Sequence, residues 1–195
     1  MKVLRESMLM EKNDLGELIY NHYENYLGTM SDRKVYKNVH CDSTIQILFY
    51  KNVFKDCITF ASFGLSKYNS ENCDKNEIVL IVDDDFYTSA SILANILFFF
   101  IINKKNIFSG TFVKGLQNIN KDFCLLHKKN ALYFTDGCIL PEDFFATCSQ
   151  VKLLVSFFIT NEECEYIEKN GNIKFEQLLE SKKCDVLDLN RPSIC

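Results

Sequence analysis

The segment 86–103 constrains the fold of this chain more than any other part of the sequence. It has the length of an ordinary helix and is apolar almost all round, with Thr88, Ser91 and Asn95 as its only narrow polar stripe. Its longest apolar run, 92–102, is interrupted at two positions and is well short of the roughly 18 to 20 residues that a membrane span requires. The pattern therefore predicts a central helix that is buried on nearly every side.

Short runs rich in β-branched and aromatic residues lie on both sides of this helix and predict a β-sheet. The runs 44–50 and 57–63 are separated by a polar stretch and could pair as a hairpin. The hydrophilic segment 68–77 predicts a loop that leads into a buried strand at 78–82. Four further strands are predicted, at 110–115, 124–127, 131–135 and 151–159.

Helices are predicted at both ends of the chain. Over about 14–28, apolar residues recur at spacings of three and four, and Gly28 is a natural stop. After the last strand, Thr160 and Glu163 fit a capping box, in which each side chain satisfies a free backbone N–H at the helix start. Together with a second short helix, this segment predicts helical structure over about 161–182.

The order of these elements predicts an α/β (α+β) fold in which helices flank a mixed, largely antiparallel sheet. The chain of 195 residues has the usual size of one domain. Its 17 Phe and 9 Tyr against 7 Gly and 2 Pro are typical of a packed interior and unlike a linker-rich chain. We therefore expect a single domain over 1–195.

Nine cysteines and the amino-terminal residues bear on where the chain works. The start, MKVLRESMLMEKND, lacks the continuous apolar core of a signal peptide, so we expect a cytoplasmic protein with reduced thiols. The sequence contains no CxxC, no Cys/His pair at zinc spacing, no Walker loop, no dinucleotide fingerprint and no HExxH. We therefore expect no metal and no cofactor.

Two groups of residues could carry catalysis. Asp83, Asp84 and Asp85 follow a predicted strand and could hold a divalent metal, but carboxylates just before a helix also cap its N–H groups. The histidines could serve as bases for a nucleophile, yet none lies in a recognisable catalytic motif; they are His22, His40 and His127. The sequence predicts a protein that is not an enzyme, with a metal-dependent hydrolase using the aspartate run as the alternative.

The net charge of −4 bears on the class of partner. Neutralising phosphates requires clustered Lys and Arg, and here the basic residues are scattered, which disfavours nucleic acid. No membrane partner is expected either. A basic protein partner suits the charge better, and Tyr and Phe beyond those that the core needs could anchor such an interface.

Several short segments form an ordered set along the chain. They are Phe60-Ala-Ser-Phe-Gly-Leu-Ser66, Glu77-Ile-Val-Leu80, the apolar helix, Leu140-Pro141, Phe157-Phe-Ile-Thr-Asn-Glu-Glu163 with Tyr166-Ile167 and Gly171, and Asp188-Leu-Asn-Arg-Pro-Ser193. In this order and spacing they resemble the Suppressor-of-fused-like family, from about Thr44 to the carboxyl terminus. One departure is the absence of tryptophan, which bears on packing and not on the fold.

The resemblance implies a function. Short bacterial members of this family look like immunity proteins or antitoxins, encoded beside polymorphic secreted toxins such as those with LXG-type export domains. By that resemblance the chain would be a stoichiometric inhibitor of a cognate toxin, with an acidic surface that covers a basic, for example nuclease, toxin face. A regulator that sequesters a transcription factor, as the eukaryotic relatives do, is a further alternative.

For residues that contact the partner, the sequence favours two exposed acidic groups. One is the loop around Glu71 and Asp74, and the other is the run Asp83, Asp84 and Asp85. Complementary charge at these positions would speed association with a basic partner. The oligomeric state is left open.

Overall fold

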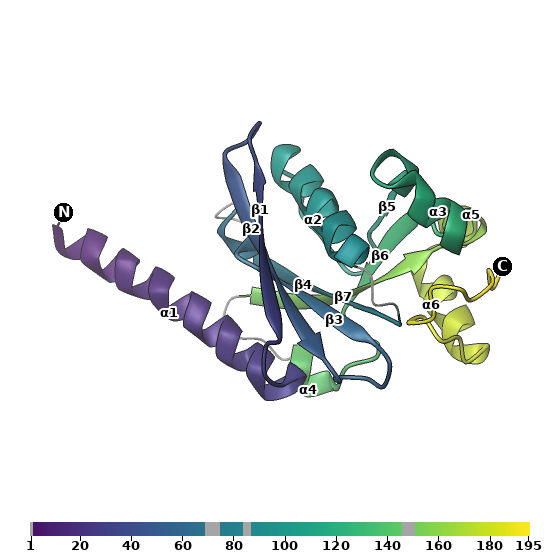
Figure 1. The fold of residues 1–195 in the computed structure, drawn as a ribbon, viewed down its shortest axis with the longest axis horizontal. Coiled ribbons are helices and arrows are strands. Elements are labelled where there is room, and N and C mark those ends of the chain that lie inside the picture. Colours follow the sequence, from purple (N-terminus) through teal and green to yellow (C-terminus); the bar gives the residue numbers. More distant parts are fainter. Residues whose placement is uncertain (1, 69–74, 84–86, 146–150) are drawn as a thin grey trace.

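Seven strands form one mixed sheet in the order β1-β2-β3-β4-β7-β6-β5 (Figure 1). The computed structural model describes residues 2–68, 75–83, 87–145 and 151–195. The strands are β1 (Asp32–Asn38), β2 (Ser43–Lys51), β3 (Ile58–Phe63), β4 (Lys75–Val82), β5 (Phe112–Lys114), β6 (Ala131–Thr135) and β7 (Val151–Ile159). β4 and β7 pair in parallel and the other neighbours are antiparallel, which confirms the predicted fold class.

Helices cover both faces of this sheet (Figure 1). They are α1 (Lys2–Leu27), α2 (Tyr87–Ile102), α3 (Lys121–His127), α4 (Glu142–Phe145), α5 (Asn161–Asn170) and α6 (Asn172–Ser181), with short 3₁₀ turns η1 (Leu65–Lys67) and η2 (Leu116–Asn118). Where helices were expected over about 14–28, 86–103 and 161–182, the structure has α1, α2 and the pair α5–α6. The helix α1 begins well before the expected position, and its amino-terminal half projects away from the sheet (Figure 1).

The central helix α2 packs on one face of the sheet. Its Leu93 and Leu97 are fully buried in a cluster with Ile47 of β2 and Leu80 of β4. This apolar surround explains why the helix carries so narrow a polar stripe. None of the helices in the described part of the chain is both long and apolar enough to cross a bilayer.

Two helical groups share the opposite face. The carboxyl-terminal half of α1 buries Ile19 and Tyr23 against β2 to β4, together with Phe144 of α4. The helices α5 and α6 bury Ile167 and Phe175 against β6 and β7. The capping box predicted at the start of α5 is present, with reciprocal bonds between the side chains and backbone of Thr160 and Glu163.

The structure corrects one expectation and adds a strand that was not predicted. The segment 124–127 was expected to be a strand, but it belongs to the helix α3. Asn120 caps this helix by accepting a hydrogen bond from the backbone N–H of Phe123, and Phe123 and His127 are buried one turn apart. The strand β1 was not predicted, because it lies at the sheet edge and most of its side chains are exposed, which leaves no apolar run.

Candidate functional site

Only one of the five predicted contact residues lies in the described part of the chain. Glu71, Asp74, Asp84 and Asp85 fall outside the described residues. The Asp83 carboxylate accepts a hydrogen bond of 2.9 Å from the backbone N–H of Leu189, and the Asp83 N–H donates to the Leu187 carbonyl. Asp83 therefore has a structural task, which is to hold the carboxyl-terminal tail, residues 182–195, beside the end of β4.

The described residues do not assemble a metal centre. Among them, no three His, Cys, Asp or Glu side chains come close enough together to hold an ion. The histidines make other contacts: the His22 Nε2 lies 2.9 Å from the Phe144 carbonyl, and the His127 Nδ1 lies 3.0 Å from the Asn190 Oδ1. Neither contact involves a nucleophile.

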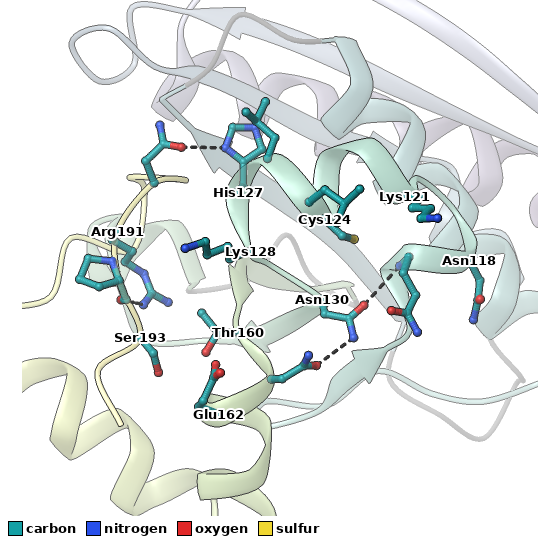
Figure 2. A pocket seen from close by; sticks show the side chains of 16 residues that line it. Asn118, Lys121, Cys124, His127, Lys128, Asn130, Thr160, Glu162, Arg191 and Ser193 are labelled. Carbon is teal, nitrogen blue, oxygen red and sulfur yellow. Dashed lines mark hydrogen bonds between the residues drawn. The ribbon is translucent and has the colours of Figure 1, made fainter.

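A cleft of about 840 Å³ lies at one end of the sheet (Figure 2). We call it the tail cleft. One wall is α3 and its flanks, the second is the start of α5, and the third is the tail at Asn190–Ser193. Its walls thus include two of the segments that carry the family resemblance, the ones that contain Thr160 and Arg191. Residues far apart in the sequence meet here.

The composition of the tail cleft includes a cysteine, a histidine and an asparagine, which in some hydrolases form a catalytic triad. The arrangement does not support that chemistry. The Cys124 sulfur points away from the His127 ring (Figure 2). Burial also raises the pKa of the Cys124 thiol, whereas a nucleophilic cysteine needs a lowered one. The tail cleft is therefore better suited to binding than to catalysis.

The outer rim of the tail cleft exposes two adjacent leucines. Leu125 and Leu126 on α3 are 67% and 66% exposed. They face outward because Phe123 and His127 of the same helix take the inward positions. Lys121 and Lys128 also line the cleft. Exposed apolar side chains within a polar surround have the layout of a protein-binding surface.

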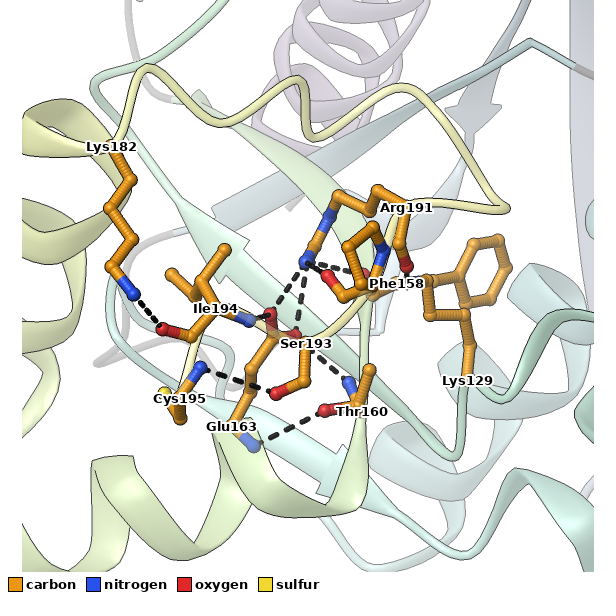
Figure 3. Close-up of polar contacts among 10 residues, drawn as sticks. Lys129, Phe158, Thr160, Glu163, Lys182, Arg191, Ser193, Ile194 and Cys195 are labelled. Atoms are coloured by element: carbon orange, nitrogen blue, oxygen red, sulfur yellow. Dashed lines mark hydrogen bonds and ion pairs between the residues drawn. The ribbon is translucent and has the colours of Figure 1, made fainter.

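A buried ion pair holds the tail against this site (Figure 3). The Arg191 guanidinium forms two bonds to the Glu163 carboxylate, from Nη1 to Oε1 at 2.5 Å and from Nη2 to Oε2 at 3.0 Å. Both side chains are almost fully buried. The Glu163 carboxylate also accepts from the backbone N–H groups of Thr160 and Ile194. It therefore caps α5 and anchors the tail at the same time.

Lys129 lies behind this ion pair and is fully buried. Its Nζ donates a hydrogen bond of 2.7 Å to the Arg191 carbonyl. Burial, and to a smaller extent the nearby Arg191 charge, lower the pKa of Lys129 to about 8, while Glu163 acts in the opposite sense. The tail is thus held by two contacts of Arg191: its guanidinium binds Glu163, and its backbone carbonyl accepts from Lys129.

The lowered pKa of Lys129 predicts a pH dependence of stability. Between about pH 8 and pH 10.5 the unfolded chain binds more protons than the folded one, so this residue makes stability rise with pH. Relative to Lys129→Met, we expect the unmodified protein to gain about 3 kcal/mol of unfolding free energy across that range. Urea denaturation of both proteins at a series of pH values measures the difference. A difference that does not change with pH would contradict the prediction.

A second buried carboxylate, that of Glu77, lies near the start of β4. Glu77 is fully buried, and its Oε1 accepts hydrogen bonds from the Gly64 N–H, the Ser66 N–H and the Ser66 hydroxyl. Its Oε2 accepts from the Ser62 hydroxyl at 2.5 Å. Burial raises the pKa of Glu77, while these donors act in the opposite sense. The segment 60–66 therefore carries its small polar residues because they bind this carboxylate.

Sequence reasoning missed Glu77, Lys129 and Arg191 as members of a structural site. For Arg191 one signal was available, because it carries the one charged side chain in the segment 189–195, and an arginine needs an acidic partner if it is buried. For Lys129 no local pattern marks the burial. The leucine pair on α3 was read as part of a strand, which hid its exposure.

Comparison with known proteins identifies the fold and the family. The family model described as Suppressor of fused protein (SUFU) matches residues 42–192. No curated protein matches this chain.

Several solved structures are similar to this chain, among them the following three. A SUFU homolog from Neisseria gonorrhoeae FA 1090 has 15% sequence identity and a TM-score of 0.72, over 93% of this chain and 97% of that one. The Sufu–Fu complex crystal structure has 13% sequence identity and a TM-score of 0.64, over 92% of this chain and 91% of that one. Drosophila Suppressor of Fused has 13% sequence identity and a TM-score of 0.61. The match covers 90% of this chain and 50% of that one. At these identities the structures show a shared fold.

Proposed function

This chain belongs to the Suppressor of fused family, and we propose that it works by binding another protein and not by catalysis. Proteins of this family mediate protein–protein interactions, and one of the similar structures is a complex between Sufu and Fu.

The observation that carries the proposal is the exposed leucine pair beside the tail cleft. The side chains of Leu125 and Leu126 are left two-thirds exposed to water on a short helix, and a partner that covers them recovers about 1 to 2 kcal/mol for each. The cleft next to them gives such a partner a concave surface, and the buried ion pair beneath keeps its walls in place. Preformed walls reduce the entropy lost on binding.

For the partner we propose a cognate toxin, which makes this chain a cytoplasmic immunity protein or antitoxin of a polymorphic toxin system. The resemblance of the sequence to short bacterial members of the family supports this identity. Inhibition would be stoichiometric, and a nuclease toxin of the LXG type is the candidate that we favour. Glu71, Asp74 and Asp83 to Asp85 are the acidic residues proposed to meet its basic face.

The test is co-purification with the product of the neighbouring gene. We expect a complex of equal stoichiometry and relief of the toxicity of that product when both genes are expressed. Failure to form the complex, or toxicity that persists despite it, would overturn the toxin proposal.

The Leu125→Asp, Leu126→Asp double variant tests the tail cleft as the contact surface. We expect partner affinity to fall at least tenfold, because two carboxylates would replace the apolar centre of the interface. The matched control is Ile173→Asp, which places the same side chain at a position on α6 that is also 66% exposed. Isothermal titration calorimetry measures both. Equal affinities for the double variant and the control would exclude the tail cleft as the contact surface.

A further inference from the structure

A second hollow, of about 610 Å³, lies where the carboxyl-terminal end of α2 meets the turn between β1 and β2. We call it the α2 hollow. It is lined from three separate parts of the chain: the β1–β2 turn, the η1 region and the segment 100–107. In Figure 1 the β1–β2 turn and one end of α2 lie at the same end of the molecule. The α2 hollow shares no lining residue with the tail cleft.

The floor of the α2 hollow is apolar. Leu65, Phe100 and Ile107 line it and belong to the central core cluster, so their inner sides are packed and their outer edges face the hollow. Two further apolar side chains at the rim are partly exposed, Ile102 at 49% and Tyr68 at 37%. An apolar floor with an exposed apolar rim provides a seat for one apolar side chain of a ligand.

The walls of the α2 hollow are held by hydrogen bonds. The Tyr68 hydroxyl donates to the Thr44 carbonyl at 3.1 Å and accepts from the Thr44 N–H at 2.8 Å. On the opposite wall, the Lys105 N–H donates to the Phe100 carbonyl at 3.0 Å and closes the end of α2. The Asn76 side chain donates to the Ile107 carbonyl at 2.6 Å. The hollow is therefore preformed, which favours binding without reorganisation.

The charge around the α2 hollow has one sign. The lining residues that carry a charge at pH 7 are Lys104 and Lys105, and both are exposed. No carboxylate of a described residue lines it, although the whole chain has a net charge of −4. Lysines after a helix also complement its dipole, but that role requires no apolar hollow between them and a neighbouring turn. The combination points to a ligand that carries negative charge around an apolar group.

We propose that the α2 hollow binds an acidic linear segment of a protein partner, with one apolar side chain on the floor and carboxylates beside Lys104 and Lys105. This inference rests on the proposed protein-binding function and deepens it by naming a surface and the chemistry of the segment. Linear segments bind through a few anchor side chains in a preformed hollow, and complementary charges set their register. A segment of this kind fits both the floor and the rim.

The experiment uses the full chain and a displayed library of random peptides of about 12 residues as the probe. We expect selection to enrich peptides in which Asp and Glu flank one apolar residue. A selected peptide, labelled with fluorescein, is then titrated by fluorescence polarisation against variants. We expect Lys104→Glu, Lys105→Glu and, separately, Ile102→Asp to weaken binding at least tenfold.

The matched control is Lys51→Glu, Lys55→Glu, which reverses two exposed charges near the β2–β3 turn and should leave the peptide affinity unchanged. A peptide with Lys in place of its acidic residues should bind the Lys104→Glu, Lys105→Glu variant better than it binds the unmodified protein.

Three results would overturn the inference: no enrichment of acidic peptides, equal binding to all variants, or concentration-dependent dimerisation that Ile102→Asp abolishes, which would make a second copy the occupant. Binding of the neighbouring gene product is scored separately. Its failure would count against the proposed toxin partner, whereas loss of peptide selectivity would count against the α2 hollow.

Discussion

Replacing Arg191 with methionine should lower the free energy of unfolding by about 3 to 5 kcal/mol. The substitution removes both charged donors from Glu163, a carboxylate that is fully buried. The N–H groups of Thr160 and Ile194 remain, but they do not replace a positive charge. Breaking one partner of a buried ion pair leaves an uncompensated charge, which costs far more than loss of an exposed pair.

The loss of this ion pair should also release the tail. Hydrogen–deuterium exchange would increase over the segment that contains Leu189 and Ile194, because their packing depends on the tail being held at Arg191. Chemical denaturation measures the stability, and Arg33→Met, an exposed arginine on β1, is the matched control. Adding Glu163→Gln to Arg191→Met should recover part of the loss. A loss below about 1 kcal/mol for Arg191→Met would show that the pair contributes no more than a surface one.

The second large effect is expected at Glu77. Glu77→Ala should cost about 4 kcal/mol or more, because four buried donors lose their acceptor and each unsatisfied one costs at least about 1 kcal/mol. The donors come from Ser62, Gly64 and Ser66, so the turn between β3 and η1 should loosen as well. Thermal and chemical denaturation measure this loss.

The conservative variant Glu77→Gln separates hydrogen bonding from charge. It keeps an oxygen for the three donors on Oε1, so the loss should stay within about 1 kcal/mol at neutral pH. The pKa of Glu77 is raised in the folded protein, so its favourable contribution is complete below the unfolded pKa and is lost as pH rises through the folded pKa. The unmodified protein should therefore lose stability relative to Glu77→Gln as pH rises from about 4. Equal losses for Gln and Ala would contradict this account.

The tail cleft and the α2 hollow differ in the side chains that they present to a partner. The tail cleft offers an exposed leucine pair with Lys121 and Lys128 beside it, and the α2 hollow offers an apolar floor under Lys104 and Lys105. Both local surfaces carry more cations than the overall composition suggests. The net charge of −4 favours a basic partner. The local cations show that the net charge of a whole chain can differ from the charge of one of its surfaces.

The errors of the sequence interpretation have physical causes. A four-residue apolar run such as 124–127 does not distinguish a strand from a short helix, and here the Asn120 cap decided for the helix. The strand β1 was missed because an edge strand pairs on one side and needs few apolar residues. No local pattern showed that the Asp83 carboxylate binds the backbone of Leu189, which lies far away in the sequence, and its contact with a partner stays a prediction.

The sequence by itself determined the central apolar helix, the strands β2 to β4, β6 and β7, and the capped start of α5. Each of these depends on periodicity or on hydrogen bonds between residues a few positions apart, and both can be recognised in the sequence. Only the tertiary structure decided that Arg191 pairs with Glu163, that Glu77 collects donors from segment 60–66, and that Lys129 is buried. These contacts join distant segments, and their energies come from burial, which no local spacing records.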